Sequence, residues 1–63
     1  MNATVKAGLI KQLISMIAWG EIDASANAII KAIASIHDLN HTIADVTDIV
    51  NAVAQEVSLE GAA

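Results

Sequence analysis

The chain has 63 residues, 56% of them apolar, with no Cys and a formal net charge of −4. This length limits it to one domain near the lower size limit for independent folding, and the lack of Cys excludes a disulfide frame and a thiolate metal site. With three Lys and Arg residues against seven Asp and Glu residues, the chain lacks the basic surface of a nucleic-acid-binding protein, so we expect no nucleic-acid partner.

The first predicted element is a helix over residues 3–19, which Asn2 or Thr4 can cap. Its apolar residues cover an arc of about 220° around the helix axis, wider than one neighbouring helix needs. Gly20 is suited to end this helix because it takes the left-handed conformation without strain. Gly8, inside the helix, is expected to permit close packing against a neighbour.

The second predicted element is a helix over residues 24–37, with Asp23 as its N-cap. Large apolar side chains lie on one face, and the opposite face carries small residues that let another backbone approach closely. These small residues are Ala24, Ala28, Ala32 and Ser35. With two packing faces, this helix is expected to be the central and most buried one.

The third predicted element is a helix over residues 43–58, because Thr42 and Asp45 fit a capping box in front of an apolar run. This placement puts a break at residues 38–42. Apolar residues also recur at every seventh position from Ile22 to Val57, so a helical hairpin whose second helix runs continuously over residues 22–58 remains the alternative. Residues 59–63 are expected to form a flexible tail.

The fold class is therefore all-α, with three short helices packed as a small bundle in a single domain over residues 1–58. One copy offers more apolar surface than it can cover, which favours a homo-oligomer. The residues expected in the core or at an interface are Leu9, Leu13, Ile17, Trp19, Ile29, Ile33, Ile36, Ile43, Val46, Val50 and Val53.

Residues with catalytic or ligand-binding chemistry form no recognisable constellation. No Ser lies in a nucleophile turn or has a His at a suggestive offset, and no Gly-rich phosphate loop exists. His37 and His41 are weak metal candidates, since their spacing is useful only if the helix continues through the expected break. We therefore expect no enzymatic activity, no cofactor and no metal. Trp19 is expected to cover the turn beside Gly20, and anchoring to a lipid interface or a partner is its alternative role.

No convincing signal peptide or membrane-spanning segment is present, since the uncharged run before Gly20 is far too short to span a bilayer. The expected location is cytoplasmic or virion-associated. The leading functional hypothesis is a small acidic self-assembly or protein–protein interaction module with a structural or adaptor role, whose partner is itself or another helical protein. Two alternatives are a membrane-active protein of bacteriocin, toxin or holin-accessory type, for which membrane contact is less favoured, and a small helical inhibitor of a partner protein.

Overall fold

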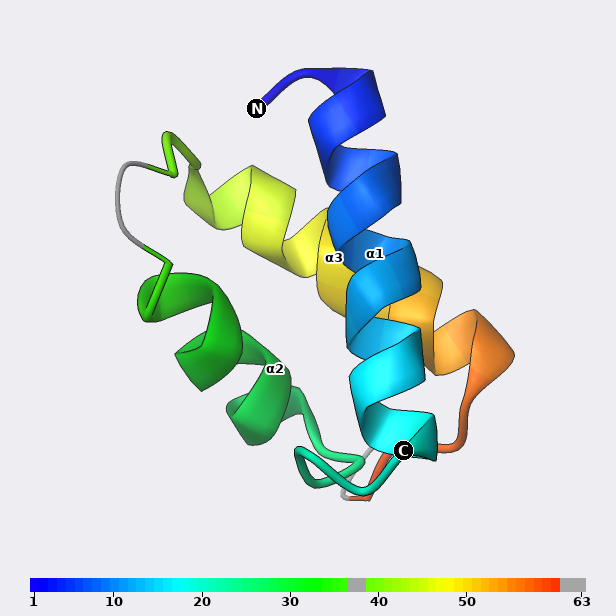
Figure 1. The fold of residues 1–63 in the computed structure, drawn as a ribbon. Helices are drawn as coiled ribbons and strands as arrows, with labels where there is room; N and C mark the ends of the chain where they lie inside the picture. The colour runs from blue at the N-terminus through cyan, green and yellow to red at the C-terminus, as the bar shows by residue number, and fades with distance from the viewer. Residues whose placement is uncertain (37–38, 61–63) are drawn as a thin grey trace.

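The computed structural model describes residues 1–36 and 39–60, and in these residues it contains three helices and no strand. The helices are α1 (Ala3–Ala18), α2 (Ala26–Ala34) and α3 (Ile43–Glu56). Figure 1 shows them packed as a small bundle. The prediction of an all-α protein with three short helices is confirmed.

Local capping groups define both ends of α1. At its start, the side chain of Asn2 accepts a hydrogen bond of 2.8 Å from the backbone N–H of Val5. At its end, Gly20 takes a positive φ of 77°, and the backbone N–H of Glu21 donates to the carbonyl of Met16 at 2.9 Å. This is a Schellman motif, in which a left-handed glycine lets the last carbonyl groups of a helix find donors. The predicted role of Gly20 is confirmed.

Helix α2 is shorter than the predicted range 24–37. Its N-cap is Ser25, not Asp23, because the Ser25 side chain accepts a hydrogen bond from the backbone N–H of Ala28 at 3.1 Å. Ala24 just before it is held by a backbone hydrogen bond of 2.6 Å from the N–H of Glu60. The backbone N–H of Ser25 donates to the carbonyl of Asp23 at 2.9 Å, and Ser25 itself is extended, so the helix begins only at Ala26.

Helix α3 begins with the predicted capping box. The hydroxyl of Thr42 accepts from the backbone N–H of Asp45 at 3.2 Å, and the Asp45 carboxylate accepts from the backbone N–H of Thr42 at 2.9 Å. A continuous helix over residues 22–58 would be about 55 Å long, whereas the longest dimension of the protein is 26 Å. The alternative of one long second helix is therefore wrong.

The core lies where α3 packs against both α1 and α2. Its buried side chains come from all three helices and from the segment after α3: Leu9, Leu13, Ile29, Ile33, Ile49, Val53 and Leu59. The expectation that the second helix is central is wrong, because α3 lies between the other two. Ile49 and Val53 are four residues apart on one face of α3, and both are fully buried in the core cluster.

The segment after α3 belongs to the fold at least as far as Glu60. Leu59 is buried in the core cluster, and Ser25 and Glu60 form an isolated parallel β-bridge. Leu59 and Glu60 therefore pack against the rest of the chain, whereas a flexible tail was predicted from residue 59 onward. Residues 61–63 lie outside the described residues.

Candidate interaction surfaces

The residues predicted for the core or an interface divide into three groups. Leu9, Leu13, Ile29, Ile33 and Val53 are buried, whereas Ile17, Val46 and Val50 are partly buried and pack against the core. Trp19, Ile36 and Ile43 are exposed, with 83%, 40% and 87% of their surface accessible. Ile36 and Ile43, predicted for the core or an interface, lie on the surface of this chain. Because α2 ends at Ala34 and α3 begins at Ile43, their seven-residue spacing does not describe one helix face. As surface residues they remain candidates for an interface.

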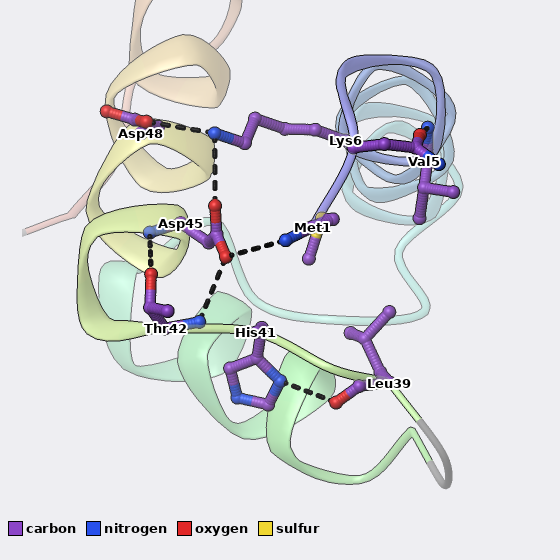
Figure 2. A network of polar contacts seen from close by, with 9 residues as sticks. Met1, Val5, Lys6, Leu39, His41, Thr42, Asp45 and Asp48 are labelled. Carbon is purple, nitrogen blue, oxygen red and sulfur yellow. Dashed lines mark hydrogen bonds and ion pairs between the residues drawn. The ribbon is translucent and has the colours of Figure 1, made fainter.

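Asp45 is the centre of a network of polar contacts that joins the start of α1 to the start of α3 (Figure 2). The Lys6 ammonium group lies 3.2 Å from one Asp45 carboxylate oxygen and 2.9 Å from the carboxylate of Asp48. The N-terminal ammonium group of Met1 lies 3.2 Å from the other Asp45 oxygen. These contacts let the Asp45 carboxylate be buried.

The same contacts shift two pKa values in opposite directions. The hydrogen bond from the Thr42 backbone, followed by those from Lys6 and the N-terminal ammonium group, holds the pKa of Asp45 well below its usual range. Hydrogen bonds to Asp48 and then Asp45 raise the pKa of Lys6. Asp45 and Lys6 are therefore both charged over the whole physiological pH range.

An open groove lies beside this network, between the start of α1 and the segment before α3. It is lined by Met1, Asn2, Val5, Leu39 and Asn40. Val5 and Leu39 point toward one another from its two sides (Figure 2). Ile43 follows soon after Asn40 as the first residue of α3. We call this region the Ile43 end, meaning the groove residues together with Ile43 and the Lys6–Asp45–Asp48 network.

The other end of the bundle is acidic around an exposed aromatic ring. Trp19 is the C-cap of α1, and Glu21 and Asp23 follow in the connection to α2. The backbone contact between Glu60 and Ala24 brings a further carboxylate to this connection. We call this region the Trp19 end, defined by Trp19, Glu21, Asp23 and Glu60. None of its carboxylates takes part in an ion pair among residues 1–36 and 39–60.

The described part of the chain contains no group of three or more His, Asp or Glu residues that could hold a metal ion. His41 is exposed, and its Nδ1 atom lies 3.0 Å from the carbonyl oxygen of Leu39. The other metal candidate, His37, lies outside the described residues. Among residues 1–36 and 39–60, no helix has the length and apolar character needed to cross a bilayer.

Sequence reasoning missed the long-range contacts more than the local ones. It assigned Asp45 to the capping box but gave no sign that Lys6, on a different helix, would reach it. It also missed Leu59 as a core residue, since one Leu after the last helix carries no periodic signal. The sequence offers one weak indication of the Asp45 network. The chain has three basic residues against seven acidic ones, so one Lys side chain is readily shared by two carboxylates.

Comparison of the chain with protein-family models, with curated proteins and with solved structures gives no significant match.

Proposed function

We propose that this protein is a small helical interaction module that self-associates through its Ile43 end and serves a structural or adaptor role. The observation that carries the proposal is the exposure of Ile43, which is 87% accessible and follows in the chain soon after Leu39 and Asn40, two residues that line the groove. Burying one such side chain completely contributes about 1.5–3 kcal/mol. In a symmetric dimer each copy supplies this contribution, since both present the same patch.

The charges at the two ends favour the Ile43 end as the contact between copies. A net charge of −4 opposes self-association in general. At the Ile43 end, however, the carboxylates of Asp45 and Asp48 are already paired with Lys6 and the N-terminal ammonium group. Two copies that meet there bring together apolar side chains and internally compensated charges, and so avoid the like-charge repulsion expected at the Trp19 end.

Sedimentation velocity of the wild type and two variants tests this proposal. Ile43→Asp places a charge in the proposed contact, and it suits the fold because an acidic residue in the first turn of a helix is favourable. Trp19→Ala is the matched control, since it removes an equally exposed apolar side chain from the opposite end. We expect the wild type and Trp19→Ala to form the same oligomer, and Ile43→Asp to be monomeric.

The proposal fails if the wild type is a monomer at every concentration tested, or if Trp19→Ala and not Ile43→Asp dissociates it. Circular dichroism of each variant verifies that the helices are intact, so that a change of mass reports the contact.

A membrane-active role is a second candidate, favoured by the single observation that Trp19 is exposed. Indole rings are enriched at lipid interfaces, but the neighbouring Glu21 and Asp23 would be repelled by anionic lipid. Dye release from vesicles of anionic phospholipid tests it. Leakage at low ratios of protein to lipid would favour this role over the interaction module.

A further inference from the structure

We infer that the Trp19 end binds a basic, amphipathic segment of another protein. This inference rests on the proposed function, because it gives the interaction module a partner on the surface that self-association leaves free.

The first support is the exposure of the indole ring together with the fixed backbone that carries it. Trp19 is 83% accessible and is the only aromatic residue of the chain. Its backbone is held by a hydrogen bond of 2.9 Å from its N–H to the carbonyl of Ser15, and the Schellman motif at Gly20 follows directly. A large apolar group on a rigid backbone loses little conformational entropy on binding, which is the property of binding hot spots.

The second support is the sign of the surrounding charge. Glu21 and Asp23 follow Trp19 closely in the chain, and the backbone N–H of Glu60 binds the carbonyl of Ala24 in the same connection. None of the three carboxylates forms an ion pair within the described part of the chain. The helix dipoles add to this potential, because neither α1 nor α3 has a basic residue in its last turn. The start of α2 opposes them in part, since a helix N-terminus is positive.

Charge complementarity selects the partner among the candidates for this surface. A second copy would bring the same carboxylates and be repelled, and an anionic membrane would be repelled for the same reason. A segment with Lys or Arg beside apolar side chains satisfies both features. Its cations meet the carboxylates and the face of the indole ring, and its apolar side chains cover the edge of that ring.

The test uses the intact protein and a synthetic amphipathic helix of Lys and Leu, with a matched peptide that has Glu in place of every Lys. Because Trp19 is the only aromatic residue, its fluorescence reports this surface alone when neither peptide contains an aromatic residue. We expect the Lys peptide to shift the emission to shorter wavelength with saturation, and the Glu peptide to leave it unchanged. Raising the salt concentration should weaken the binding of the Lys peptide.

Calorimetry on variants separates the contribution of the indole ring to binding from that of the carboxylates. Trp19→Ala should weaken binding of the Lys peptide by about tenfold or more, as expected for a hot-spot side chain. The triple variant Glu21→Gln, Asp23→Asn, Glu60→Gln should weaken it by about three- to tenfold, as expected for exposed charges. Ile43→Ala is the control at the opposite end and should bind as tightly as the wild type.

The inference is overturned if the Glu peptide binds as well as the Lys peptide, or if Ile43→Ala weakens binding as much as Trp19→Ala. It is also overturned if the emission shifts with vesicles of neutral phosphatidylcholine and not with the Lys peptide. Sedimentation of the same samples distinguishes the two levels of failure. If the protein is an oligomer and does not bind the Lys peptide, only this inference is refuted. If it is a monomer and does not bind the Lys peptide, the proposed function is refuted as well.

Discussion

Thr42 and Asp45 hold each other through two hydrogen bonds, one from each backbone N–H to the side chain of the other residue, of 2.9 and 3.2 Å. This reciprocal pair fixes the first turn of α3 and aims the Asp45 carboxylate at Lys6 on α1. One local motif thus starts a helix and supplies the anion that attaches another helix to it.

Replacing Thr42 by Ala should lower the free energy of unfolding by about 1 kcal/mol, the usual loss for a helix N-cap. Thr47→Ala is a matched control in the same helix, because the Thr47 hydroxyl is exposed and donates only to the carbonyl of Ile43. Its effect should stay within about 0.5 kcal/mol. Urea unfolding followed by circular dichroism measures both, and equal losses would contradict the role of Thr42 as a cap.

The lowered pKa of Asp45 predicts a loss of stability in acid. Because this carboxyl binds a proton less readily in the folded state than in the unfolded one, its contribution is complete above the unfolded pKa of about 4 and is lost as the pH falls toward the folded pKa. The urea midpoint should therefore fall steadily below about pH 4.

Asp45→Asn should remove much of this acid dependence and lower the midpoint at neutral pH. Asp48→Asn is the control, since Asp48 has one ion pair and a mostly exposed side chain. Its effect at neutral pH should be the smaller of the two. A larger loss in Asp48→Asn would show that Asp45 is not the centre of the network.

The raised pKa of Lys6 predicts the opposite behaviour in alkali. A base that binds its proton more tightly in the folded state contributes fully below the unfolded pKa of about 10.4, and that contribution is lost as the pH rises through the folded value. Lys6→Met should flatten the alkaline limb of the stability curve, whereas Lys11→Met, at a Lys outside the network, should leave it unchanged.

The two described glycines should respond to Ala with opposite signs. A Cβ atom added at Gly20 or at Gly8 would meet no atom of another part of the chain within 4 Å. Backbone conformation alone therefore decides the sign of the change in stability. Gly20→Ala should cost about 1–2 kcal/mol because φ is positive there. Gly8→Ala lies inside α1 and should stabilise by about 0.5–1 kcal/mol. Thermal unfolding of both variants checks the signs, and two changes of the same sign would contradict the argument.

Leu59→Ala should lower the free energy of unfolding by about 2–5 kcal/mol, as for other buried Leu residues. Trp19→Ala removes a larger apolar side chain from an exposed site outside the proposed contact between copies and should change it by less than about 0.5 kcal/mol. Because small domains have little stability to lose, Leu59→Ala should leave much of the chain unfolded at room temperature. A wild-type melting curve for Leu59→Ala would show that the segment after α3 does not hold the core.

Features that depend on neighbours in the sequence were predictable. The Thr42–Asp45 capping box and the left-handed Gly20 follow from a few adjacent residues, and both are confirmed. The break between the second and third helices follows from the same chemistry. These motifs are satisfied by backbone groups close in the chain, so no tertiary contact is needed to foresee them.

Features that depend on tertiary contacts could not be predicted from the sequence. The N-cap of α2 is Ser25 and not the predicted Asp23, and the residue before it, Ala24, accepts a backbone hydrogen bond from Glu60, which is distant in sequence. Ile43 belongs to the row of apolar residues at seven-residue spacing, but it is exposed because it is the first residue of α3 and does not continue the face of α2. Gly8 was expected to allow close packing, yet no other side chain approaches it. These outcomes depend on how the elements pack together, about which the periodicity of one segment carries no information.

We propose that copies of this chain meet through the Ile43 end, and light scattering behind size exclusion measures the molar mass of the wild type in plain buffer. We expect a mass at least twice that of the 6.5 kDa chain, and a return to the monomer value in Ile43→Asp. A folded wild type with the monomer mass over the whole concentration range would show that the Ile43 end does not join copies.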